Sequence, residues 1–222
     1  MSDAVLDIRD LRKKYMQGDT PVPVLNGLDL HVESGETVAI IGRSGSGKST
    51  LLSMIAGLDR PDEGKIFLAG SDITTMDEYR LTRYRGLHLG IIFQQFHLMN
   101  GLTALENIAL PLEIHRAGES DGKAREALAS VGLAGRADHL PHQLSGGECQ
   151  RVAIARAFVT QPNLLLADEP SGNLDQETGS KVMDGLFSMV ESAGMTMVLV
   201  THDQGLAANC RRTLRLDRGH LS

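Results

Sequence analysis

One eight-residue segment constrains the fold of this chain more than any other. Residues 42–49 read GRSGSGKS and match the pattern G-x-x-x-x-G-K-[ST] in full. The segment follows an apolar run at Thr37–Ile41 and precedes another at Leu51–Gly57, which is the strand-loop-helix context that the pattern requires. Glycines let backbone N–H groups surround phosphate oxygens, and the following helix adds the positive end of its dipole. The segment therefore predicts a phosphate-binding loop between a strand and a helix.

The residue types in this loop indicate distinct tasks. Lys48 is expected to reach the β- and γ-phosphates of a nucleotide, and the hydroxyl of Ser49 is expected to hold Mg²⁺. An ordinary Gly/Ser turn is the alternative interpretation, but strand, loop, lysine and serine in register favour a phosphate site. The candidate nucleotide-binding positions are Gly42, Arg43, Ser44, Gly45, Ser46, Gly47, Lys48, Ser49 and Thr50.

The rest of the chain alternates short strand-like runs with helical stretches, which is typical of an α/β fold around a mainly parallel sheet. Expected strands are 4–8, 24–32, 37–41, 66–68, 89–93, 163–167, 196–200 and 214–216. Expected helices are 48–57, 122–131, 146–159, 176–191 and 204–209. Between Thr103 and His142 the pattern turns helical, which predicts a helical subdomain inserted into the core. No linker divides the chain, so residues 1–222 are expected to form a single domain.

Composition narrows the class of protein further. The chain has 22 Lys and Arg against 28 Asp and Glu, a formal net charge of −6 that offers no basic face for nucleic acid. Its two cysteines cannot form a disulfide framework and suit a reducing, cytoplasmic compartment. The longest apolar stretches fall well short of the ~18–20 residues that cross a bilayer. We expect a cytoplasmic protein that binds no nucleic acid.

A second chemical feature is an apolar strand that ends in two acids. Residues 163–170 read NLLLADEP, so Asp168 and Glu169 stand at the carboxyl end of the strand. Ligands of doubly wound sheets gather at this edge, where the phosphate loop also lies. Because side chains alternate along a strand, the two acids point in different directions. We expect Asp168 to support Mg²⁺ and Glu169 to orient or deprotonate an attacking water.

Residues 144–148, LSGGE, resemble the LSGGQ-type signature of ATP-binding cassette (ABC) ATPases. From the residues alone, Ser145 caps a helix whose first turn holds Gly146 and Gly147, so free N–H groups converge on a point that suits an anion. A well-capped surface helix is the alternative. The resemblance extends over nearly the whole chain in family order: Tyr15, the loop at 42–49, Gln94, the signature, Asp168-Glu169, 171–175 and His202.

The resemblance implies a P-loop NTPase fold with an antiparallel β subdomain and an inserted helical subdomain. It also implies that two copies sandwich two Mg-ATP head to tail, with Ser145, Gly146, Gly147 and Glu148 of one copy closing on the nucleotide of the other. Asp175 is expected to link the two sites.

The remaining site residues take their roles from the same resemblance. Tyr15 is expected to stack on adenine, although an ordinary surface tyrosine is the alternative. Gln94, preferred over its neighbour Gln95, is expected to touch Mg²⁺ and the attacking water. His202 is expected to contact the γ-phosphate and support Glu169, although a lone histidine is often structural. Cys149 and Ser171 depart from the residues usual in close relatives, at positions that do not contact phosphate.

The resemblance implies an ATPase that drives separate transmembrane permease subunits from the inner face of the membrane. The helical block from Thr103 to His142 and the segment 94–101 are the expected docking surface. Segments 56–59, 102–107 and 168–175 resemble ATPases of lipoprotein-releasing and macrolide-efflux permeases. Two alternatives stay open: an ABC ATPase acting on DNA or ribosomes, and a cell-division-type ATPase that gates a periplasmic process without transport.

Overall fold

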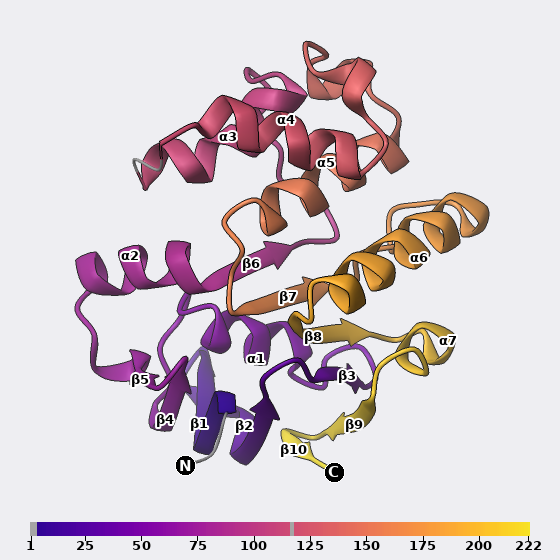
Figure 1. Cartoon of the computed structure of the whole chain (residues 1–222). Helices are drawn as coiled ribbons and strands as arrows, with labels where there is room; N and C mark the ends of the chain where they lie inside the picture. Colours follow the sequence, from indigo (N-terminus) through magenta and orange to yellow (C-terminus); the bar gives the residue numbers. More distant parts are fainter. Residues whose placement is uncertain (1–3, 116–117) are drawn as a thin grey trace.

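The computed structural model describes residues 4–115 and 118–222 and contains two β-sheets (Figure 1). The smaller sheet is antiparallel, with strand order β2-β1-β4-β5. Its strands are β1 (Ala4–Gln17), β2 (Thr20–Glu33), β4 (Glu63–Leu68) and β5 (Ser71–Asp72). Gly18, with φ of 62°, occupies the tight turn that joins the two long strands into a hairpin. This hairpin carries Tyr15 near its tip.

The larger sheet has the strand order β10-β9-β3-β8-β7-β6. Its strands are parallel except for β10, which pairs with β9 in the antiparallel direction. Its strands are β3 (Thr37–Ile41), β6 (Leu89–Ile92), β7 (Leu164–Asp168), β8 (Thr196–Thr201), β9 (Arg212–Asp217) and β10 (His220–Leu221). The central strands β3, β7 and β8 are apolar at nearly every position because both faces of the sheet are covered. Their carboxyl ends meet at one edge.

Helices α1 (Lys48–Ile55), α6 (Gln176–Ser192) and α7 (Gln204–Ala207) follow strands of the larger sheet. Helices α3 (Ala104–Ile114), α4 (Ser120–Ser130) and α5 (Gly146–Phe158) form a helical layer above it (Figure 1). The helical layer has its own apolar cluster, which includes Ile108, Leu128 and Val152. Another part of α5 packs with the sheet through Ile154. Helix α5 therefore joins the helical layer to the core.

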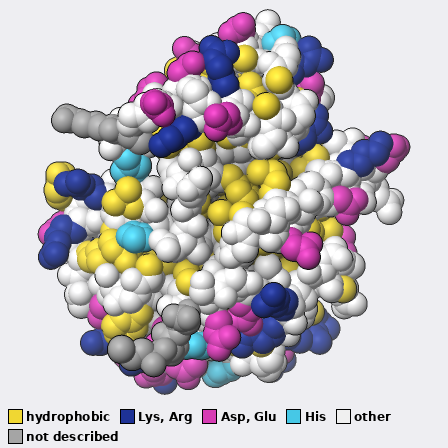
Figure 2. Space-filling model, viewed as in Figure 1, with side chains coloured by type: hydrophobic (Ala, Val, Ile, Leu, Met, Phe, Trp, Pro, Cys, Tyr) yellow, Lys and Arg dark blue, Asp and Glu magenta, His cyan; other side chains and the backbone are white. Residues whose placement is uncertain are grey.

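The surface on this side is mixed in charge. Figure 2 shows side chains of both signs interspersed, with hydrophobic side chains gathered in the hollow between the helical layer and α6. Within residues 4–115 and 118–222, none of the helices combines the length and apolar character needed to cross a bilayer.

Helix α2 (Glu78–His88) was missed by the sequence analysis. Only Leu81 is buried on it, so it has no apolar periodicity to detect, although Asp77 caps it by accepting from Arg80 N–H. Strands β1 and β2 also extend well beyond 4–8 and 24–32 because their outer halves form an exposed hairpin. In the described part of 103–142 the structure has helices and two 3₁₀ turns, but no strand. Most other boundaries shift by one to three residues.

Candidate nucleotide-binding and catalytic site

A cavity of about 730 Å³ lies at the carboxyl ends of β3, β7 and β8. It gathers residues from six separate parts of the chain. Of the predicted site residues, Ser46 and the four signature residues are outside its lining, while Val24 lines it and was not predicted. The lining consists of Tyr15, Val24, Gly42, Arg43, Ser44, Gly45, Gly47, Lys48, Ser49, Thr50, Gln94, Asp168, Glu169 and His202.

The loop at 42–49 needs glycine at two positions for steric reasons. A Cβ on Gly42 would lie 2.5 Å from the carbonyl oxygen of Leu216. Gly47 has φ of 104° and immediately precedes α1, whose first residue is Lys48. The ammonium of Lys48 donates to the carbonyls of Gly42 at 2.8 Å and Arg43 at 3.1 Å. The loop therefore surrounds the Lys48 side chain, and its two carbonyls hold the ammonium group where phosphate oxygens are expected to bind.

The two acids that end β7 lie in different environments. Burial raises the pKa of Asp168, and the nearby carboxylate of Glu169 raises it further, while Lys48 and the Ser49 hydroxyl act in the opposite direction. A carboxylate and a hydroxyl beside a phosphate loop suit Mg²⁺, which takes few protein ligands and shares phosphate oxygens and water. The donors of Asp168 and Ser49 therefore fit the predicted metal.

Glu169 is held from several sides. Its backbone has φ of 44°, a left-handed conformation that costs a non-glycine residue about 1–3 kcal/mol unless its surroundings impose it. One carboxylate oxygen lies 2.8 Å from Nδ1 of His202, and the other accepts from the hydroxyl of Thr201 at 3.2 Å. Thr201, to which sequence analysis assigned no role, is the last residue of β8, and His202 follows it directly. The carboxylate therefore has a defined orientation toward the cavity.

Gln94 is tied to the loop that follows the acidic strand. Its side-chain amide donates to Oδ1 of Asn173 at 3.3 Å, and the Asn173 amide donates to the Gln94 carbonyl at 3.0 Å. The next residues are fixed by Arg156 of α5, which donates to the carbonyls of Phe96 at 2.8 Å and His97 at 2.6 Å. Both Phe96 and His97 have positive φ. Asn173 stood in a recognised segment without an assigned role, whereas no local signal marks Arg156.

Tyr15 lies at the rim of the cavity. The residue is 43% exposed, and its hydroxyl donates to Asp59 at 2.9 Å. Burial raises the pKa of Tyr15, and the hydrogen bond to Asp59 raises it further. The hydroxyl is thus anchored while the residue stays partly exposed at the cavity, where an aromatic ring could stack on a planar base.

The signature residues stand apart from the cavity, at the start of α5. The Ser145 hydroxyl accepts from the Glu148 N–H at 3.3 Å, and the Glu148 carboxylate accepts from the Ser145 N–H at 2.8 Å. These reciprocal bonds form a capping box, so the predicted helix cap at Ser145 is confirmed. Thr103 and Glu106 form a second capping box at the start of α3. The N–H of Ser145 lowers the pKa of Glu148. One chain thus presents two separate groups of predicted nucleotide-binding residues.

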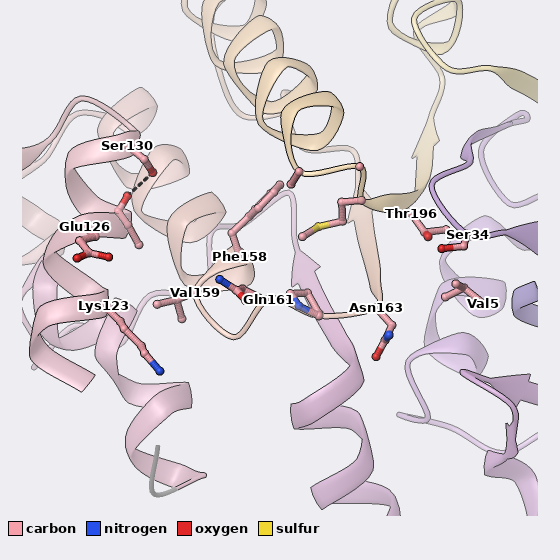
Figure 3. Close-up of a pocket in the computed structure, with 15 residues that line it drawn as sticks. Val5, Ser34, Lys123, Glu126, Ser130, Phe158, Val159, Gln161, Asn163 and Thr196 are labelled. Carbon is pink, nitrogen blue, oxygen red and sulfur yellow. Dashed lines mark hydrogen bonds between the residues drawn. The ribbon is translucent and has the colours of Figure 1, made fainter. Parts of the chain in front are cut away.

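A second cavity, of about 800 Å³, lies at the opposite edge of the sheet (Figure 3). Lys123 and Glu126 of α4 line one side, and Asn163 and Thr196, at the amino ends of β7 and β8, line the other. It contains none of the predicted site residues. Doubly wound sheets bind ligands at the carboxyl ends of their strands, so the candidate site is the cavity around the phosphate loop.

A profile of the ABC transporter family matches residues 25–172, more than half of the chain. The chain therefore belongs to the ABC transporter family, with the P-loop NTPase fold, and it is an ATPase subunit. Both the family and the fold class were predicted and are confirmed.

Curated relatives and a solved structure match this chain over nearly its full length. The chain is 47% identical to an uncharacterized ABC transporter ATP-binding protein, YbbA, of Escherichia coli (strain K12), covering 99% of this chain and 97% of that protein. It is 47% identical to the lipoprotein-releasing system ATP-binding protein LolD of Geobacter metallireducens, covering 98% of each. The macrolide export ATP-binding/permease protein MacB of Rhodopirellula baltica is 44% identical over 97% of this chain but only 32% of that protein. The ATP-binding cassette MJ0796, solved as a dimer in a post-hydrolysis state bound to ADP and Pi, superposes with a TM-score of 0.90 at 40% identity, covering 98% of this chain and 96% of that one.

Proposed function

We propose that two copies of this chain hydrolyse Mg-ATP at their interface and drive separate permease subunits of the lipoprotein-releasing or macrolide-efflux type. The observation that carries this proposal is the separation of two groups of site residues. The cavity holds the phosphate loop, both acids and His202, whereas Ser145 and Gly146 are exposed on another element. A second copy placed head to tail would bring its signature to this cavity. The dimeric MJ0796 cassettes support such an arrangement.

In this proposal each polar group of the cavity has one task. Ser49, Asp168 and Gln94 would hold Mg²⁺, which supplies positive charge to the phosphate oxygens when bound. The N–H groups of the loop and the ammonium of Lys48 would bind the phosphates. Tyr15 would stack on adenine.

The carboxylate of Glu169 is placed to accept a proton from the attacking water. The hydrogen bond between His202 Nδ1 and this carboxylate fixes the imidazole, so that its Nε2 would face the γ-phosphate. Electrostatic positioning of this kind supplies most of the acceleration in phosphoryl transfer.

A groove next to Gln94 fits the proposed docking of a permease. Its volume is about 490 Å³, and it lies between the segment after Gln94 and the turn before the signature. It is lined by Gln95, Phe96, His97, Leu98, Asn100, Pro141, His142 and Cys149. A cytoplasmic element of a permease seated here would hold this chain at the inner face of the membrane. The names LolD and MacB of the relatives support the permease type.

Glu169→Gln tests the catalytic part of the proposal. Loss of a general base is expected to lower kcat at least 100-fold, while ATP affinity stays within about twofold because the phosphate cradle is intact. The exposed pair of Glu177 with Lys181 makes Glu177→Gln a suitable control, with unchanged turnover. Near-normal hydrolysis by Glu169→Gln would refute the assignment.

Co-purification from detergent-solubilised membranes tests the partner. Recovery of a permease-like protein whose substrate is transported supports the proposal. Recovery of a membrane partner that only gates a periplasmic enzyme would instead establish the cell-division-type role, and recovery of nucleic acid would contradict both.

A further inference from the structure

Gln150 is a buried amide that connects two functional parts of the chain. It lies on α5, five residues after the signature serine Ser145, and its side chain is fully buried. Its Nε2 donates to the carbonyl of Pro170 at 2.6 Å. Pro170 directly follows Glu169, so one hydrogen bond joins the signature helix to the turn that carries the proposed base.

That turn depends on hydrogen bonds from its surroundings. Glu169 has φ of 44°, and its N–H donates to the Val200 carbonyl at 2.9 Å. The carbonyl of Glu169 accepts from Gly172 N–H, also at 2.9 Å. These two bonds come from β8 and from the turn itself. The bond from Gln150 is different because it comes from the helix that begins at the signature.

Stability alone does not explain an amide at this position. Among the described residues, no donor lies within hydrogen-bonding distance of Oε1 of Gln150, which is also buried. A buried acceptor without a partner is unfavourable, and this cost offsets the gain from the bond to Pro170, so the amide adds little net stability over an apolar side chain of the same size. The amide is therefore better explained by the geometry that it imposes on Pro170 and Glu169.

We propose that Gln150 is a positioning residue for ATP hydrolysis: it fixes the turn at Glu169 and couples the orientation of that carboxylate to the signature helix. This inference rests on the proposed role of Glu169 as the base. In the dimer, the signature end of α5 would contact the partner's nucleotide, while Gln150 of the same helix would hold the base of its own site. Contact of the signature end of α5 with the partner's nucleotide would thus also orient the Glu169 carboxylate.

Gln150→Met tests the proposal because methionine keeps the length and volume while removing the donor. We expect kcat to fall about tenfold, which corresponds to about 1.4 kcal/mol, whereas KM and the ATP dissociation constant stay within threefold. The melting temperature is expected to change little, because the variant removes the unpaired Oε1 but leaves the buried Pro170 carbonyl without its donor. Val152→Ala, at a fully buried α5 position in the helical cluster, is the control: it should lower the melting temperature with kcat within twofold.

Combining Gln150→Met with Glu169→Gln in one protein tests whether Gln150 acts through Glu169 or whether its loss disturbs the site in general. If Gln150 acts through Glu169, Gln150→Met should change the single-turnover rate of the Glu169→Gln protein by less than twofold. A tenfold loss that persists in that background would overturn the proposal, as would a kcat within twofold of wild type for Gln150→Met alone. A Glu169→Gln protein that hydrolyses ATP normally would instead refute the proposed base, a result distinguishable from these two.

Discussion

The two capping boxes of the helical layer allow the signature to be tested against a matched control. At Ser145, the hydroxyl accepts from Glu148 N–H at 3.3 Å; at Thr103, it accepts from Glu106 N–H at 3.2 Å. The reciprocal bonds from each cap residue's N–H to the carboxylate are 2.8 and 2.7 Å. The two caps are nearly identical in geometry, but only Ser145 belongs to the surface proposed to meet the partner's nucleotide.

Alanine at either cap removes the same local interaction. Loss of a serine or threonine cap costs about 1 kcal/mol, so Ser145→Ala and Thr103→Ala should each lower the free energy of unfolding by about this amount. For a chain of this length the melting temperature should fall by about 2–4 °C in both variants. Differential scanning calorimetry without nucleotide measures this shared cost.

Function should separate the two variants. In the Glu169→Gln background, ATP-driven dimerisation followed by analytical ultracentrifugation should weaken for Ser145→Ala and stay unchanged for Thr103→Ala. The loss of a hydrogen bond to a charged phosphate, worth about 1.5–3 kcal/mol, predicts a dimer dissociation constant at least tenfold higher. Equal dimerisation by both variants would refute the proposed contact of Ser145 with the partner's nucleotide.

Three further changes test single groups of the cavity. Lys48→Ala should raise the ATP dissociation constant at least tenfold by calorimetric titration, because a charge-assisted bond to phosphate is lost. Asp168→Asn should stabilise the nucleotide-free protein at neutral pH, because the raised pKa of Asp168 shows that its ionisation is unfavourable in the folded state. Unfolding scans should show that the gain in free energy of unfolding grows as the pH rises and vanishes below the pKa of aspartate in the unfolded chain. Gly172→Ala should leave stability within about 0.5 kcal/mol but reduce kcat, because the new Cβ would lie 2.7 Å from the side-chain amide nitrogen of Gln94 and displace it. An unchanged kcat for this last variant would show that the position of Gln94 is not critical.

Local patterns predicted the parts of this site that are encoded over a few consecutive residues. The phosphate loop, the acids that end β7 and the helix cap at Ser145 depend on residue types at fixed short spacings. Parallel strands then bring their carboxyl ends to one edge, so Asp168 and His202 were expected to lie near Lys48 without knowledge of the structure. Lys48, Asp168 and His202 all line one cavity.

Contacts between distant segments could not be predicted in this way. Gln94 pairs with Asn173 across 79 positions, and Arg156 reaches the carbonyl of Phe96 across 60. A glutamine or an arginine on a helix has no local pattern that names its partner. Helix α2 escaped detection for the related reason that its surface is mostly polar and exposed, so that its sequence lacks periodicity.

These distant contacts converge on α5. Gln150 and Arg156 are six residues apart, which places them about 120° apart around the helix and about 9 Å apart along it. One therefore faces Pro170 while the other faces the carbonyls of Phe96 and His97, which line the proposed permease groove. Burial lowers the pKa of Arg156, so a guanidinium that lost these acceptors would be left partly desolvated and unpaired. Movement of the groove segment away from Arg156 is thus unfavourable unless α5 follows it, and α5 cannot move without changing the contact that holds Glu169.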